Sequence, residues 1–305
     1  MHIPDHMLNG AICPVTAGIS AVAVAASVYF AFKSDEKPAS LKFAAVASLI
    51  FALQMMNFPI LNGTSGHFLG TTLAISLLGI PFGILSMIMV IAVQCLVFSD
   101  GGISILGANI LNMALVGSIP GIIINYIFKN RKLINSNLKK GILIFSASWL
   151  SIVLASLSCS IELWISGTVS FIKIFPAMVG VHSLIGIFEG VITVVLFSIL
   201  YVSQIKESRK LSAGIPIISA IVIGLLLSPF ASGFPDGLEW VAKKYSFLHD
   251  SAPLFVSFLP DYTLPVIKNE ILTTGIAGLI GVLITFLLVF IIGLLLKIKT
   301  GEIKN

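Results

Sequence analysis

The first two residues, Met1 and His2, can chelate a metal ion before any folding takes place. The α-amine, the amide nitrogen of His2 after loss of its proton, and the His2 imidazole can occupy three corners of a square around one ion. Planar, nitrogen-rich sites are characteristic of Ni²⁺ and Cu²⁺. His67 is the candidate for the fourth corner, because it ends a stretch, 57–67, that is punctuated by Gly, Pro and Asn between two apolar runs. We predict a divalent-metal site at these three residues; the alternative is that Met1 and His2 only mark where translation starts.

The composition indicates where such a site would be located. The 305 residues are 57% hydrophobic and only 10% charged, and the mean hydropathy of +1.07 is far above that of a soluble domain. This predicts an all-α integral membrane protein, a polytopic helical bundle surrounded by lipid. The net charge of +5 comes from basic residues in short loops between apolar runs, so we expect no nucleic-acid partner.

Nine apolar runs approach the length of about 20 residues that a membrane-spanning helix needs. We predict about seven crossings in residues 1–210 and two more in residues 211–305. The runs are 11–32, 41–56, 68–79, 84–98, 105–128, 141–159, 178–202, 215–230 and 271–296. Asp5 stands where a signal peptide would carry basic residues, so we expect the first run and Met1 to remain in the mature chain.

The distribution of charge predicts the orientation of the chain. With the N-terminus outside, the cytoplasmic segments would be 33–42, 129–140, 203–214 and 297–305, which hold 14 of the 18 Lys and Arg residues. An excess of Lys and Arg marks the cytoplasmic side, so we predict the N-terminus outside and the C-terminus inside. The start of the chain and the 57–67 stretch then lie on the same outer face.

Two separated motifs carry a resemblance to a known family. Met-His-Ile-Pro-Asp at the N-terminus, and Asn57-Phe-Pro with Gly63-Thr-Ser-Gly-His67, resemble the cobalt/nickel substrate-binding (S) components of energy-coupling-factor transporters, the CbiM/NikM family. The resemblance implies a plasma-membrane protein whose transported substrate is Ni²⁺ or Co²⁺, bound by the first two residues and the loop histidine. It also implies partners: an energy-coupling transmembrane subunit and two ATPase subunits. The sequence has no GxxxxGK[ST] phosphate loop, so other chains must hydrolyse ATP.

Two further stretches are similar to the same family. Asn109 and Asn112 follow an Asp-Gly-Gly turn and lie three apart on one helix face; they either bond the metal loop or the N-terminal peptide, or only join helices. His182 and Glu189 share another helix, seven residues or roughly 10 Å apart. An ionisable group inside a membrane span is a functional candidate. Glu189 is an interior anchor, a gate or a charge on the metal route, and His182 a neighbour of the site.

Three residues near the two motifs are candidates for contacts around the metal. Asn57 and Ser65 belong to the loop motif. His6 departs from the family, which usually has a small residue there; it would compete as a ligand, support the site or face the medium, and we favour the last two.

The C-terminal part carries its own motif. Pro-Asp236-Gly-Leu-Glu resembles the small two-helix accessory component of the same transporters, here fused. We therefore divide the chain into a metal-binding domain, 1–210, and an accessory domain, 211–305. Asp236, Asp261 and His249 could collect cations outside the membrane, but we favour a solvated face.

Other functions lack their signatures. A membrane metalloenzyme would need a constellation such as HExxH, which is absent, so we predict no enzyme. A self-sufficient ion-coupled carrier would contain inverted repeats, and none is evident. Planar nitrogen ligation favours nickel, with cobalt close behind. Binding is expected to weaken as the pH falls toward the ordinary histidine pKa near 6.5.

Overall fold

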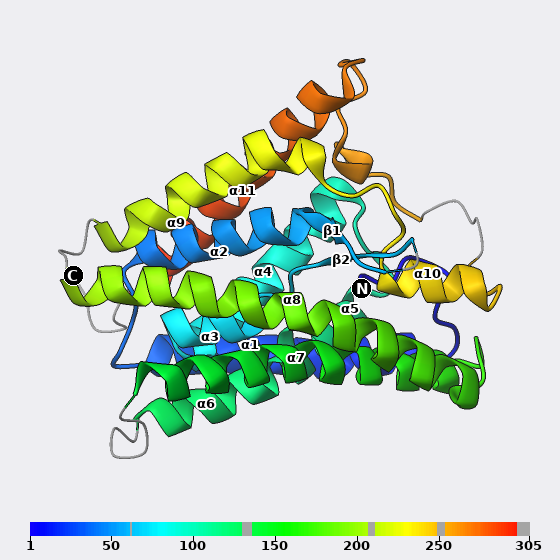
Figure 1. The fold of residues 1–305 in the computed structure, drawn as a ribbon, viewed down its shortest axis with the longest axis horizontal. Helices are drawn as coiled ribbons and strands as arrows, with labels where there is room; N and C mark the ends of the chain where they lie inside the picture. Colours follow the sequence, from blue (N-terminus) through cyan, green and yellow to red (C-terminus); the bar gives the residue numbers. More distant parts are fainter. Residues whose placement is uncertain (62, 130–135, 207–210, 249–253, 298–305) are drawn as a thin grey trace, which may run out of the picture.

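The protein is a bundle of long helices (Figure 1). The computed structural model describes residues 1–61, 63–129, 136–206, 211–248 and 254–297. Seven helical stretches in this part of the chain are long and apolar enough to cross a membrane. The prediction of an all-α, multi-pass membrane protein is confirmed.

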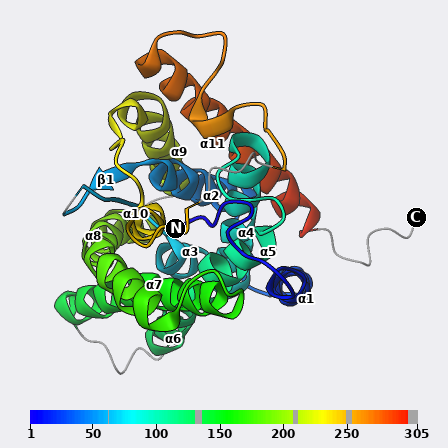
Figure 2. The ribbon, with the colours of Figure 1, turned by 90° about the vertical axis from the view of Figure 1, so that its right-hand side faces the viewer.

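The long helices account for seven of the nine predicted runs. They are α1 (Ile12–Lys33), α4 (Ile80–Phe98), Leu106–Lys129, α7 (Asn137–Ile165), α8 (Phe171–Lys206), Ala213–Phe230 and α11 (Glu270–Leu295). An eighth helix, α2 (Ser40–Met55), is sixteen residues long and almost entirely buried in the middle of the bundle. Figure 2, which looks along the bundle, shows α2 surrounded by other elements.

Two of the long stretches are irregular, and short elements connect the rest. Leu106–Lys129 consists of α5 (Leu106–Asn109), a π-helical segment (Ile110–Leu115), a 3₁₀ segment (Val116–Ser118) and α6 (Ile119–Lys129). The penultimate stretch consists of α9 (Leu211–Ile221), a π-helical segment (Val222–Leu227) and a 3₁₀ segment (Ser228–Phe230). The connection to α11 contains α10 (Gly237–Lys244) and a 3₁₀ turn (Pro260–Tyr262).

The predicted run 68–79 is not a continuous helix. It contains only α3 (Thr71–Leu78), whose eight residues extend about 12 Å. The preceding residues, 68–70, are not helical, and Gly70 has a left-handed conformation with φ of 85°. Buried side chains take over backbone hydrogen bonds there: Gln54 donates to the Leu69 carbonyl at 2.6 Å. At Gly79, where φ is 83°, α3 ends and α4 begins, so the chain reverses direction there.

The accessory part packs along the central helix α2, against which both α9 and α11 lie. The approach of α11 is close at Gly281, where an added Cβ would collide with the ring of Phe51. The helices α9 and α11 therefore share a core with α2.

The two ends of the bundle differ in character. The stretch 57–67 forms a hairpin of β1 (Asn57–Pro59) and β2 (Ser65–His67), in which Asn57 pairs with His67. The N-terminus lies beside β2, right of centre in Figure 1. The C-terminal ends of α1 and α6, which carry Lys33 and Lys129, lie at the opposite, left-hand end.

Candidate metal-binding site

The N-terminal peptide is buried rather than frayed. Met1, His2 and Ile3 are 5%, 8% and 0% exposed. Asn109 holds this peptide from α5: its side-chain oxygen accepts the Ile3 N–H at 2.8 Å and its amide donates to the Ile3 carbonyl at 3.1 Å. The Gly102 N–H donates to the same carbonyl at 2.9 Å. Asn109 therefore binds the N-terminal peptide and does not serve only to join helices.

The start of the chain meets the hairpin histidine. The α-amine nitrogen of Met1 lies 2.6 Å from Nε2 of His67. Nδ1 of His67 lies 3.0 Å from the Phe68 carbonyl oxygen, which places the ring proton on Nδ1 and directs the Nε2 lone pair at the α-amine. Two nitrogens on adjacent corners of a square, each about 2.0 Å from a metal, would be about 2.8 Å apart. The observed spacing suits that arrangement.

The His2 ring lies beside His67 but is engaged elsewhere. The two rings stack with centroids 5.2 Å apart, and Nδ1 of His2 lies 3.1 Å from Oδ1 of Asp100. Nε2 of His2 is buried without a hydrogen-bond partner. Chelation through the His2 amide and side chain uses Nδ1, so it requires the ring to turn about Cβ–Cγ and release Asp100.

Asp236 forms an ion pair with the α-amine of Met1. Its other oxygen caps α10 by accepting the Glu239 N–H at 2.8 Å, and its side chain is only 16% exposed. The interpretation of Asp236 as part of a solvated face is therefore wrong, because the chain folds the Pro-Asp-Gly turn back onto the N-terminus. Asp261 is exposed, and His249 lies outside the described residues.

The hairpin positions this turn. The Ser65 N–H donates to the Pro235 carbonyl and its hydroxyl to the Phe234 carbonyl, both at 2.8 Å. The carbonyl of Asn57 accepts the N–H of Ser232 at 2.8 Å. Asn57 and Ser65 thus hold Asp236 against the amine, through the Asn57 carbonyl, the Ser65 N–H and the Ser65 hydroxyl.

Asp100 links His2 to the accessory part. The Tyr262 hydroxyl donates to Oδ2 of Asp100 at 2.6 Å, and Gln94 donates to the Tyr262 oxygen at 3.3 Å. Sequence reasoning singled out neither Asp100 nor Tyr262. The Asp-Gly-Gly turn that contains Asp100 was the available signal, whereas nothing in the sequence indicates Tyr262.

Electrostatics prepare His67 to bind a metal. Burial, and then the nearby ammonium group, lower the pKa of His67 to about 3. Its imidazole is therefore neutral near pH 6.5, and protonation of His67 cannot be what weakens binding in that range. Burial disfavours ionisation of Asp100 and Asp236, but the charge of His2 and the N-terminal ammonium, respectively, hold their pKa values below the ordinary value.

Two of the predicted candidates act at a distance from the amine. Glu189 accepts the N–H groups of Leu69 and Gly70 at 2.8 and 2.9 Å, so it anchors the non-helical residues that follow His67. Asn112 donates to Oε2 of Glu162 at 2.6 Å, which joins two helices away from the N-terminal peptide.

The remaining two candidates differ in burial. His182 donates through Nδ1 to the Met178 carbonyl at 2.8 Å, and its buried Nε2 has no partner. Met1, His67 and His182 line one small cavity. His6 is exposed, with a φ of 67°.

Side chains alone do not form a metal site in the described ranges. No group of three or more His, Cys, Asp or Glu residues there could hold a metal ion. The α-amine of Met1, 2.6 Å from Nε2 of His67, is a further nitrogen at this place that could serve as a ligand.

Comparison with known proteins agrees with this fold. The family model for CbiM, described as cobalt uptake substrate-specific transmembrane region, matches residues 2–207, and that for the PDGLE domain matches residues 210–298. The NikMN protein of Archaeoglobus fulgidus, named as a fused nickel transport protein, is 35% identical over 301 residues, which cover 95% of this chain and 97% of that one. The cobalt transport protein CbiM of Clostridium tetani is 26% identical and covers 68% of this chain and 88% of its own length.

A crystal structure of a transition metal transporter has a TM-score of 0.58 and 28% sequence identity, and covers 70% of this chain and 96% of that one. The relatives are named as transport proteins, which confirms the expectation that the chain is not an enzyme. The buried N-terminus, the multi-pass bundle and the family match over most of the length lead to one assignment: this chain belongs to the CbiM family and carries a PDGLE domain at its C-terminal end.

Proposed function

We propose that this chain is the substrate-binding membrane component of an ATP-driven energy-coupling-factor transporter that takes up Ni²⁺, with Co²⁺ a close second. The names of the relatives support metal transport. The observation that carries the proposal is the distance of 2.6 Å between the Met1 amine and Nε2 of His67, because it joins two parts of the chain that are far apart in sequence through two nitrogen donors.

The metal would be held by four nitrogens: the α-amine, the His2 amide, the His2 imidazole after its ring has turned, and His67. A planar nitrogen set suits Ni²⁺. The Phe68 carbonyl fixes the His67 ring through Nδ1, as partners of metal-binding histidines commonly do. Asn109 holds the peptide that carries the other three donors.

Binding would exchange carboxylate contacts for metal contacts. In the metal-free chain, Asp236 engages the amine and Asp100 engages Nδ1 of His2. The metal would displace one proton from the amine and one from the amide, both released to the solvent, and Asp236 would lose its ammonium partner. Asp100 would release Nδ1 as the ring turns.

The two parts of the chain would cooperate in capture. In our proposal the N-terminus faces outside the plasma membrane, so the metal is captured there and released inward. The energy comes from partners, a coupling transmembrane subunit and two ATPase subunits. The 1–210 domain supplies the four nitrogens, and the 211–305 domain supplies Asp236 and Tyr262.

The proposal can be tested by titrating the purified full-length chain with Ni²⁺ and following the visible absorption of planar nickel. His67→Ala should weaken binding by more than about 100-fold, since loss of a supporting group alone costs about 10- to 100-fold. His6→Ala, an exposed histidine at the same end, is the matched control and should bind as wild type. Equal affinities of the two variants would refute the proposed ligand set.

A further inference from the structure

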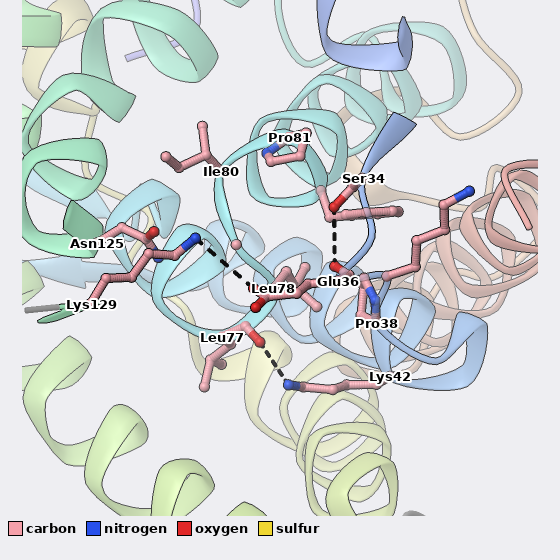
Figure 3. A pocket seen from close by; sticks show the side chains of 13 residues that line it. Ser34, Glu36, Pro38, Lys42, Leu77, Leu78, Ile80, Pro81, Asn125 and Lys129 are labelled. Carbon is pink, nitrogen blue, oxygen red and sulfur yellow. Dashed lines mark hydrogen bonds and ion pairs between the residues drawn. The ribbon is translucent and has the colours of Figure 1, made fainter. Parts of the chain in front are cut away.

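A second cavity lies where α1 and α6 end, at the end of the bundle opposite the N-terminus (Figure 1), and Figure 3 shows the side chains that line it. It has a volume of about 400 Å³. Its walls come from three places: the connection between α1 and α2, the turn between α3 and α4, and the last turns of α6. The cavity thus lies where several helices end.

The charged side chains around the cavity are mainly basic. Lys37, Lys42 and Lys129 line it, against the single carboxylate of Glu36. The Lys42 ammonium donates one hydrogen bond, to the Leu77 carbonyl at 2.7 Å, which leaves further N–H donors on the same nitrogen.

The other two lysines contribute differently. Lys129 lies 3.9 Å from Glu36, and the two side chains are 66% and 87% exposed. Such an exposed, long ion pair contributes little and is easily exchanged. Lys37 donates to the Leu296 carbonyl at 2.7 Å, so it adds positive potential rather than a free donor. The cavity therefore offers donors and a net positive charge, which suit an anion.

The neighbouring surface indicates where the anion comes from. In the turns of α6 before Lys129, Ile119, Ile123 and Tyr126 are 46%, 52% and 65% exposed, as expected for side chains that face acyl chains. The apolar run of α4 begins in the wall of the cavity, at Ile80. The cavity thus lies at the boundary between apolar and polar surface, at the level of lipid phosphates.

We propose that this cavity binds the phosphate group of an anionic phospholipid headgroup, with Lys42 and Lys129 as donors. Basic pockets between transmembrane helices are a known way of binding anionic headgroups. Glu36 opposes binding, and Lys129 is free to turn from it toward the phosphate. The inference concerns a surface distant from the metal site and does not depend on the proposed transport function.

The test uses the purified full-length chain in nanodiscs and native mass spectrometry of the lipids that it retains. With phosphatidylglycerol, Lys129→Gln should reduce retention by clearly more than the factor of about five that one basic residue near a lipid surface contributes, because it also removes a hydrogen-bond donor from the cavity. Glu36→Gln should increase it by a similar factor. Lys33→Gln removes one exposed charge at the same end but outside the cavity, and should reduce retention by no more than about fivefold, the effect of surface charge alone. Nanodiscs of phosphatidylcholine should show no dependence on these variants.

Several results would overturn the proposal. Equal losses in Lys129→Gln and Lys33→Gln would mean that bulk charge alone attracts the lipid. Release of phosphatidylglycerol by inorganic phosphate, with phosphate retained in its place, would identify a site for free phosphate. Loss of assembly with a coupling subunit in Lys129→Gln, with lipid retention unchanged, would make the cavity a protein contact. Thermal unfolding of each variant shows that the fold is intact.

Discussion

Asn109 should set the affinity of the chain for metal although it touches no metal ligand directly. It makes two hydrogen bonds with the peptide unit of Ile3, at 2.8 and 3.1 Å, and is 1% exposed. Asn109→Ala removes both. A hydrogen bond between neutral groups contributes about 1 kcal/mol, and a buried group left without a partner costs about 1–3 kcal/mol. The Ile3 carbonyl keeps its bond from Gly102, so the N–H of Ile3 is the group left unpaired.

The total loss is then about 2–4 kcal/mol for the docked N-terminal peptide, which corresponds to a metal affinity about 30- to 900-fold lower. The assay is competition for Ni²⁺ between the purified chain and a chelator of known affinity. Asn9→Ala is the control, because Asn9 is exposed and close to the same segment. A folded Asn109→Ala variant that binds nickel within about twofold of wild type would refute the view that docking of this peptide forms the site.

Three further predictions concern the surroundings of the site. Gly237→Ala should weaken nickel binding and lower the melting temperature, because an added Cβ would lie 2.9 Å from Cε1 of His182. Gly233→Ala is the control: no atom lies within 4 Å of the added Cβ there, so this variant should behave as wild type in the same assays. Glu189→Gln should destabilise the chain by about 1.5–3 kcal/mol in thermal unfolding, because a neutral amide replaces a carboxylate that accepts two N–H groups. The control is Glu270→Gln, which should have little effect because Glu270 is exposed in the first turn of α11. The metal-free chain should lose stability as the pH falls from about 6.5 toward 3, because His67 takes up a proton in the unfolded chain but, with a pKa of about 3, not in the folded chain. In thermal unfolding across this range, the stability of His67→Gln should depend less steeply on pH than that of the wild type. An equally steep dependence would contradict the lowered pKa of His67.

Much of the bundle could be predicted from hydropathy, because a membrane span of about 20 apolar residues leaves an unambiguous pattern. The meeting of Met1 with His67 could also be expected, since two crossings separate them and return the chain to the same face. The run 68–79 misleads because apolar composition does not distinguish a non-helical buried segment from a helix. The conformation of these residues depends on buried polar partners, and the two partners, Gln54 and Glu189, are distant in sequence from the residues that they hold.

The carboxylates around the N-terminus were the least predictable part of the site. Asp236 reaches the amine because Ser65 binds the Pro-Asp-Gly turn, a contact between residues about 170 positions apart. Spacing within the sequence carries no information on such a contact. The same holds for Tyr262 and Asp100, and for the His2 ring, whose orientation depends on Asp100.

The central claim is that the α-amine of Met1 is itself a metal ligand. Adding one residue ahead of Met1, through a cleavable extension, moves the amine out of register while every side chain remains. Metal analysis of the purified chain after incubation with Ni²⁺ should find one nickel per chain for wild type, almost none for the extended chain, and one again after cleavage restores Met1 as the first residue. An extended chain that still retains one nickel would show that the metal is held by other groups.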